Sequence, residues 1–304
     1  MAAMQFETPP APAAAAPPAK PFTKKFWKSV RDFPMLYLGA LIIVLLILAA
    51  VLAPVISPHN PTTQFSDGLT ESGIPVGPSA KFPLGADNLG RDILSRVLYG
   101  AQVSLLVGVI STVINLVLGV LVGTVAGYFG GWVDNVLMRV TDIILAFPLL
   151  LFAMALVAVL GPSLWNVLFA IGVLGWGTMA RVVRGQVLAV KEFEYVQAER
   201  ALGASNTRIM FRVILPNIIG PVIVLSTLNV GQNILVEAGL SFLGIGIQPP
   251  TPSWGNMIEA GMQTYQVAPW TLWFPGLALV IAVLGFNLLG DGLRDILDPR
   301  NTQH

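Results

Sequence analysis

The chain has 304 residues, of which 55% are hydrophobic and only 11% are charged, and its formal net charge is +1. A soluble globular domain carries about 25% charged residues. This deficit, together with a mean hydropathy of +0.74, indicates an integral membrane protein. Cysteine is absent from the sequence, which excludes disulfides, thiolate metal sites and cysteine nucleophiles. The two histidines, His59 and His304, lie too far apart in the chain for a HExxH zinc site.

Residues 1–30 are predicted to form a disordered cytoplasmic tail. Residues 8–18 are rich in proline and alanine, a composition that is typical of disorder. Basic residues then gather directly before the first apolar run: Lys20, Lys24, Lys25, Lys28 and Arg31. Basic residues this close to a span indicate a cytoplasmic anchor rather than a secretory leader.

Six apolar runs approach the length of about 20 residues that a membrane-spanning helix needs. In chain order they cover Met35–Ile56, Ser104–Phe129, Val136–Leu160, Leu164–Ala180, Ile218–Val236 with a continuation to Leu243, and Leu272–Leu289. They predict an all-α integral membrane protein with six transmembrane helices. Arg139 and Asp142 interrupt the third run, and we interpret them as a structural ion pair or a headgroup contact.

The second run carries glycine at every fourth position, at Gly119, Gly123 and Gly127. Small residues at this spacing allow two helix backbones to approach closely. We therefore expect this face of the helix to pack against a neighbouring span rather than to contact a substrate.

The distribution of lysine and arginine predicts the orientation of the spans. With the N-terminus in the cytoplasm, the cytoplasmic segments hold Lys20, Lys24, Lys25, Lys28, Arg31, Arg139, Arg181, Arg184, Lys191, Arg200, Arg208, Arg212, Arg294 and Arg300. The external segments then hold only Lys81, Arg91 and Arg96. Because positive charge concentrates on the cytoplasmic side, both termini and residues 181–217 are expected to face the cytoplasm.

Two long loops are then external, residues 57–103 and residues 246–270. Loops of this length are usually either functional or disordered. The external loop charges Arg91, Asp92 and Arg96 have two interpretations: they contact an external partner, or they organise the loop itself.

A polar, charged segment separates the fourth and fifth runs. Gln197–Leu202 consists of good helix formers, and Gly203 suits a helix C-terminus. Ser205 or Asn206 then caps a second helix, and Pro216 leads into the next span. The expected structure is a helix–turn–helix at the membrane surface. It either docks a partner from the water or lies on the membrane without one.

This segment resembles the EAA loop of ABC-transporter permeases. The spacing of that motif is kept by Gln197-Ala198-Glu199, by Gly203 and by Val213-Ile214-Leu215-Pro216, with glutamine and glutamate at the first and third motif positions. In that family the loop forms a coupling helix that sits in a cleft of the ATP-binding subunit. The resemblance therefore implies ATPase docking through Glu194, Gln197, Ala198, Glu199, Arg200, Gly203 and Ala204.

Four further stretches resemble C-type permeases of dipeptide, oligopeptide and nickel importers. They are Pro83–Leu105, Gly127–Asn135, Pro249–Gly255 and Phe286–Pro299. The resemblance implies the type-I ABC importer permease fold. It divides the chain into residues 31–80, with the first helix and the start of an external loop; residues 100–290, the permease core with the coupling loop at 190–216; and residues 291–304, a cytoplasmic tail.

The same resemblance implies an assembly in the bacterial cytoplasmic (inner) membrane. It would contain a B-type permease partner, cytoplasmic ATP-binding subunits and an extracytoplasmic solute-binding protein, and it would import di- or oligopeptides by alternating access. Nickel complexes and glutathione are alternative substrates. No cofactor is expected in this chain, since the partner subunits bind ATP and magnesium.

Nothing in the sequence predicts catalysis by the chain itself. A P-loop places glycine directly before its lysine, and none of the six lysines follows a glycine. The stretch Gly239-Leu-Ser241-Phe-Leu243 lacks the last glycine of a nucleophile elbow. The chain is therefore predicted to be a transport subunit and not an enzyme.

Polar residues recur in the fifth run at helical spacing: Asn229, Gln232, Asn233 and Glu237. Such residues inside a membrane mark transport pathways or contacts between helices. We predict that this stripe lines the translocation path, with hydrogen bonding between helices or ion pairing as the alternative. An ion-coupled secondary transporter is a less favoured reading, because it needs ionisable residues in several spans and inverted repeats.

Overall fold

The first described helix, α2 (Pro34–Val51), is apolar throughout and has a proline in its first turn, where a missing N–H costs no hydrogen bond. It belongs to a computed structural model that describes residues 33–297. Within that range no β-strand occurs, and five stretches are long and apolar enough to cross a membrane, or six if one bent pair counts as a span. The all-α membrane fold predicted from the sequence is confirmed. The predicted tail at residues 1–30 lies outside the described residues.

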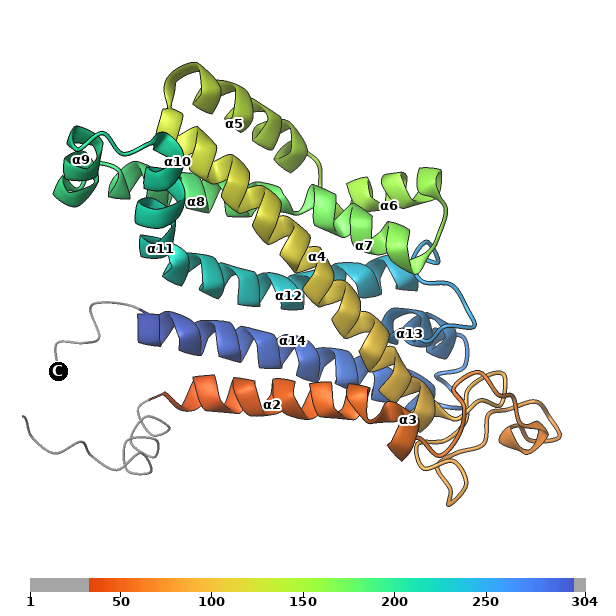
Figure 1. Ribbon diagram of the computed structural model, residues 1–304. Helices are drawn as coiled ribbons and strands as arrows, with labels where there is room; N and C mark the ends of the chain where they lie inside the picture. The colour runs from red at the N-terminus through yellow and green to blue at the C-terminus, as the bar shows by residue number, and fades with distance from the viewer. Residues whose placement is uncertain (1–32, 298–304) are drawn as a thin grey trace, which may run out of the picture.

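Helices α2, α14 (Trp270–Leu297) and α12 (Ile219–Phe242) lie side by side, and the long helix α4 (Ile93–Phe129) runs obliquely across them (Figure 1). After α2 and the short α3 (Ala53–Ile56) come a single turn of 3₁₀-helix at Ser66–Gly68 and the long helix α4. The later spans are α7 (Leu164–Leu174) with α8 (Trp176–Val190), α12 and α14.

The third predicted span is not one straight helix. It consists of α5 (Gly131–Ala146) and α6 (Leu149–Leu160), which meet at an angle of 87°. The bend lies at Phe147, whose backbone is extended, directly before Pro148. Proline removes a helical hydrogen bond and disfavours the helical conformation of the residue before it, so the apolar run breaks at this point.

The ends of three other predicted spans also differ from the structure. The second begins at Ile93 instead of Ser104, which shortens the predicted loop 57–103. The fourth span continues through a break at Gly175 to Val190 instead of ending at Ala180, and the sixth continues to Leu297 instead of Leu289. In α8 the continuation is stabilised by ion pairs to α5: Arg181 pairs with Asp142 at 2.6 Å, and Arg184 pairs with Asp134. One interpretation of the sequence was an ion pair between Arg139 and Asp142. In the structure Asp142 pairs with Arg181 instead.

The glycine stripe of α4 packs against α8, as predicted. A Cβ atom on Gly119 would lie 2.5 Å from Met179 Cβ, and one on Gly123 would lie 2.5 Å from the Ala180 carbonyl oxygen. At Gly127 the nearest atom would be Val187 Cβ at 2.9 Å. Only glycine allows this approach of two helix backbones.

The two ends of the bundle carry different structures. At one end, called here the insert end, the start of α2 and the end of α14 lie near residues 191–218 (Figure 1). At the other, the loop end, lie residues 57–92 and the short helix α13 (Trp254–Met262). This division agrees with the two groups of loops that the charge distribution separates.

Candidate functional site

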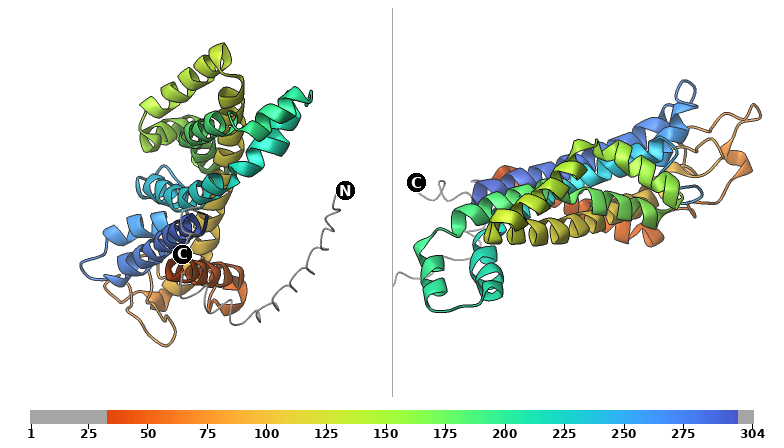
Figure 2. Two further views of the ribbon diagram at one scale, coloured as in Figure 1. Left: turned by 90° about the vertical axis from the view of Figure 1, so that its left-hand side faces the viewer. Right: turned by 90° about the horizontal axis from the view of Figure 1, so that it is seen from above.

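The insert, residues 191–218, stands off from the end of the spans (Figure 2). Its first helix is α9 (Glu194–Ala201), followed by a turn, α10 (Asn206–Arg208), a π-helical turn η2 (Ile209–Ile214) and α11 (Leu215–Asn217). Ser205 Oγ accepts from the N–H of Arg208 at 3.4 Å, so the predicted cap of the second helix is confirmed at Ser205.

The turn between α9 and α10 is a Schellman motif built on Gly203. Gly203 has a φ of +80°, which residues with a side chain rarely adopt. Its N–H donates to the Arg200 carbonyl at 3.0 Å, and the N–H of Ala204 donates to the Glu199 carbonyl at 3.1 Å. These two bonds satisfy carbonyls at the end of α9 and fix the direction in which the chain leaves the helix.

A small apolar cluster anchors the insert to the bundle. Val196 of α9 is fully buried together with Ile209 and Ile214 of η2, and these side chains continue into a cluster with Val187 and Val190 of α8. The insert is therefore packed onto the end of α8 and is not a detached loop.

Polar contacts tie the insert to the end of α4 as well. Tyr128 Oη donates to Asn206 Oδ1 at 2.8 Å, and the guanidinium of Arg200 lies 5.6 Å from the centre of the Tyr128 ring. Lys191 Nζ donates to the Gly127 carbonyl at 3.0 Å. A movement of α9 would consequently be transmitted to both α4 and α8.

The predicted docking residues lie mainly at the surface of the insert. Those that are exposed are Glu194, Gln197, Ala198, Arg200 and Gly203, while Glu199 and Ala204 are half-buried. Two of them also serve the insert itself: Gln197 Nε2 donates to the Lys191 carbonyl at 3.1 Å, and Glu199 lies 3.7 Å from Arg208 Nε in an ion pair.

One exposed apolar residue was missed by the sequence interpretation. Leu202, in the turn after α9, is 85% exposed, although it is as apolar as the residues of the spans. Phe193 and Tyr195 are exposed at the start of the same helix. Its exposure could have been predicted from the sequence, because Leu202 comes directly before the glycine that ends a polar helix, where no core is available to bury a leucine.

The polar stripe of α12 is divided between two environments. Asn233 and Glu237 are buried against α4, where Asn233 Nδ2 donates to Thr112 Oγ1 at 2.9 Å. Asn229 is half-buried and Gln232 is exposed. For Asn233 and Glu237 this geometry favours hydrogen bonding between helices, the alternative left open by the sequence. For Asn229 and Gln232 a place on the translocation path stays a prediction.

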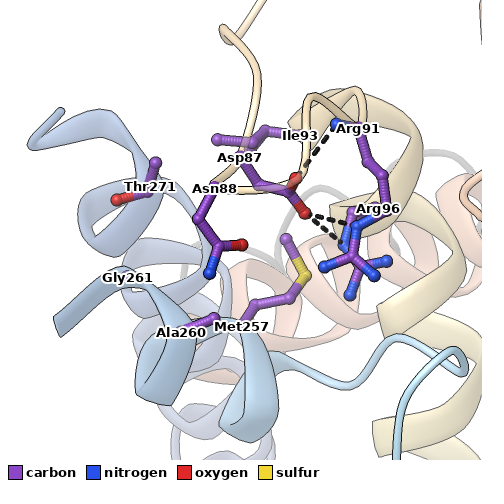
Figure 3. Close-up of a pocket in the computed structure, with 9 residues that line it drawn as sticks. All are labelled: Asp87, Asn88, Arg91, Ile93, Arg96, Met257, Ala260, Gly261 and Thr271. Carbon is purple, nitrogen blue, oxygen red and sulfur yellow. Dashed lines mark hydrogen bonds and ion pairs between the residues drawn. The ribbon is translucent and has the colours of Figure 1, made fainter. Parts of the chain in front are cut away.

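At the loop end, charged side chains surround a small cavity (Figure 3). The Asp87 carboxylate lies 2.7 Å from Arg91 Nε and 3.3 Å from Arg96 Nε, and all three side chains are buried. Arg96 also donates to the Pro61 carbonyl at 3.0 Å. The cavity measures about 10 Å³, enough for roughly one water molecule and far too small for a peptide. These charges therefore organise the loop.

An exposed ion pair supports the same loop. Lys81 Nζ donates to the Asp67 carboxylate, and this hydrogen bond holds the pKa of Asp67 below its ordinary value. The Lys81 ammonium also lies over the rings of Phe65 and Phe82.

A membrane-spanning helical bundle that carries a packed polar insert at one end and an ordered loop at the other has the features of a transport permease subunit. Residues 119–303 match the family described as binding-protein-dependent transport system inner membrane component. Residues 21–70 match the N-terminal transmembrane domain of oligopeptide transport permease C. The chain belongs to this permease family and is a C-type permease subunit of an ABC importer.

Two relatives show the extent of the similarity. The chain is 42% identical over 282 residues to the dipeptide transport system permease protein of Alkalihalophilus pseudofirmus. It is 44% identical over 277 residues to the glutathione transport system permease protein of Escherichia coli. Each match covers 91% of this chain and 90% of the relative. Membership of an importer of this class implies partner subunits that bind ATP, and the permease itself is not the catalytic subunit.

Proposed function

We propose that this permease imports di- or oligopeptides across the bacterial cytoplasmic membrane, with the insert and both termini in the cytoplasm. The proposed assembly contains a B-type permease, cytoplasmic ATP-binding subunits that hold ATP and magnesium, and an extracytoplasmic solute-binding protein. The names of the relatives, a dipeptide permease and a glutathione permease, support a substrate with peptide bonds. Glutathione and nickel complexes remain alternative substrates within the same architecture.

The observation that carries this proposal is the attachment of α9 to two spans. Its exposed face, with Ala198 and Leu202, is free to dock an ATP-binding subunit. On its other face Val196 packs in a cluster with α8, and Arg200 lies over the ring of Tyr128 of α4. In the proposed cycle, ATP binding closes the ATPase pair, α9 follows, and the attached spans rearrange so that the path opens outward. Hydrolysis then returns the path to the inward-open state.

The proposed path runs along α12. Within the predicted stripe of that helix, Gln232 and Asn229 are the residues that keep exposed surface, and amide groups suit the backbone that all peptides share. The buried pair Asn233 and Glu237 would support the wall of this path from behind.

Uptake into proteoliposomes tests the proposal. Vesicles that contain the permease, its membrane partner and the ATP-binding subunits, with the solute-binding protein outside, are expected to accumulate a radiolabelled dipeptide only when ATP is enclosed. Competition by unlabelled glutathione or by a nickel–histidine complex identifies the preferred class. Uptake that persists without ATP but follows an imposed proton or sodium gradient would contradict the proposal.

A further inference from the structure

The carboxylate of Glu237 lies fully buried between α4 and α12, near the loop end of the bundle. Glu237 of α12 is 0% exposed and accepts hydrogen bonds from two serine hydroxyls. Ser104 Oγ of α4 donates to it at 3.0 Å, and Ser241 Oγ, one turn further along α12, donates at 2.8 Å. No ion pair found within residues 33–297 includes Glu237.

Each of these serines also receives a backbone hydrogen bond. Ser241 Oγ accepts from the N–H of Ile247 at 3.1 Å, and Ser104 Oγ accepts from the N–H of Trp254 at 3.4 Å. A hydroxyl has one proton to donate and two lone pairs to accept with. Because Glu237 takes the proton of both hydroxyls, their lone pairs are directed at these two backbone groups.

The two backbone groups bracket residues 247–254, called here the Trp254 loop. Asn256 holds the same loop from inside, since its Nδ2 donates to the carbonyls of Ile247 at 3.1 Å and Thr251 at 2.8 Å. The Trp254 ring is fully buried, and its Nε1 donates to the Val97 carbonyl at 3.1 Å. The base of the loop is therefore fixed, while the residues of its tip, from Gln248 to Thr251, are exposed.

We propose that Glu237 is a positioning residue for transport. Acting through Ser104 and Ser241, it holds the Trp254 loop in one orientation at the loop end of the bundle, which the proposed function makes the side where substrate enters. Without the carboxylate, both hydroxyls are free to rotate toward other acceptors, and the buried N–H groups of Ile247 and Trp254 lose their partners. The importance of the loop for transport rests on the proposed function, but its restraint by Glu237 does not.

This role predicts a different response to substitution than substrate contact does. In Glu237→Gln the amide oxygen still accepts one serine proton, and the amide N–H₂ donates to the other serine, which has lone pairs for both this group and the backbone N–H. Two hydrogen-bonded relays, each running from residue 237 through a serine hydroxyl to a backbone N–H group, therefore persist without the carboxylate. Glu237→Leu has a similar volume but removes both relays. If the carboxylate bound the ammonium group of a peptide instead, Gln and Leu would both raise KM.

The natural absence of cysteine allows a direct test of the loop. A nitroxide spin label is attached to Thr251→Cys in the full-length permease, reconstituted in lipid vesicles. Its electron paramagnetic resonance spectrum reports the mobility of the loop whether or not the permease transports a substrate. We expect a restricted spectrum in the parent and in Glu237→Gln, and a mobile spectrum in Glu237→Leu. Leu235→Ala, on the exposed face of the same helix, is expected to leave the spectrum unchanged.

Transport kinetics complete the test. In the assembled transporter Glu237→Leu is expected to lower kcat about tenfold, the effect of leaving buried polar groups unpaired, with KM kept within twofold, and Glu237→Gln is expected to restore kcat. The single variants Ser104→Ala and Ser241→Ala each break one relay and serve if Glu237→Leu fails to fold. Unchanged label mobility in Glu237→Leu and in both serine variants would overturn the inference, as would a raised KM in Glu237→Gln. Failure of the parent to transport any peptide would instead count against the proposed function.

Discussion

Tyr128, the penultimate residue of α4, donates a hydrogen bond of 2.8 Å to Asn206 of the insert. This bond joins the segment that we propose to dock the ATPase to the longest helix of the bundle. Removal of this bond is expected to weaken the mechanical coupling between the insert and α4 while both elements stay folded.

Tyr128→Phe is accordingly expected to uncouple ATP hydrolysis from transport. It deletes the hydroxyl but keeps the ring beneath Arg200, so the loss is one hydrogen bond, about 1 kcal/mol. Peptide transported per ATP hydrolysed is expected to fall about fivefold, with ATPase binding unchanged. Parallel assays of phosphate release and uptake measure this ratio, and an unchanged ratio would show that Tyr128 does not transmit the movement of α9.

Leu202→Arg is expected to weaken docking without affecting the fold. Leu202 is 85% exposed, so its replacement should change stability by less than about 0.5 kcal/mol. Burial of a leucine in an interface contributes about 1.5–3 kcal/mol, so affinity for the ATP-binding subunit should fall at least about tenfold. Surface plasmon resonance on the permease in nanodiscs measures this affinity. Ile74→Arg, in the loop at the opposite end, is the matched control, and an equal loss in both variants would exclude a specific role.

Gly123→Ala is expected to separate α4 from α8. Its Cβ would lie 2.5 Å from the Ala180 carbonyl oxygen, and overpacking of this kind costs about 1–3 kcal/mol. Gly185→Ala, in the partner helix α8, is the control, because its Cβ meets no atom within 4 Å. It should be neutral or stabilising, since alanine favours helices. Thermal unfolding in detergent compares them; equal melting temperatures would contradict the close packing.

Asp87→Asn is expected to destabilise the loop end. It leaves the buried guanidiniums of Arg91 and Arg96 without their shared carboxylate, and breaking a buried pair costs about 3–5 kcal/mol. Limited proteolysis of residues 57–92 in the folded protein measures the effect. Proteolysis at the parent rate would show that the pair does not hold the loop.

Asp67→Asn is the control for that experiment, because its pair with Lys81 is exposed and exposed pairs contribute little. Lys81 lowers the pKa of Asp67 below its ordinary value of 3.8. The contribution of this pair is therefore present at neutral pH and is lost only as the pH falls through the lowered value. At pH 7 and pH 5 the loop should be equally resistant to protease.

Sequence patterns predicted contacts where one residue type has one structural use. Glycines at every fourth position predicted the α4–α8 contact, because a Cβ atom there would overlap α8. Gly203 predicted the end of α9, because residues with a side chain rarely adopt its positive φ. The bend before Pro148 was available in principle, since proline restricts the residue before it, but the apolar run on both sides obscured it.

The spacing of residues in the sequence did not predict which neighbours surround the polar stripe of α12. Asn233 and Glu237 lie against α4, while Gln232 beside them is exposed. Helical periodicity places residues on one side of a helix, but it does not say which neighbour covers that side. Similarly, Arg91 lies four residues after Asp87, yet their burial depends on residues of α13 and α14, far along the chain.

Purification of the assembly from gently solubilised native membranes, followed by mass spectrometry, tests the central claim most directly. The parent is expected to recover a second permease and ATP-binding subunits. Ala198→Arg, which adds charge to the exposed face of α9, is expected to retain the second permease and lose the ATPases. Recovery of equal amounts of ATPase with both proteins would contradict docking on α9, and a parent that purifies alone would contradict the importer assembly itself.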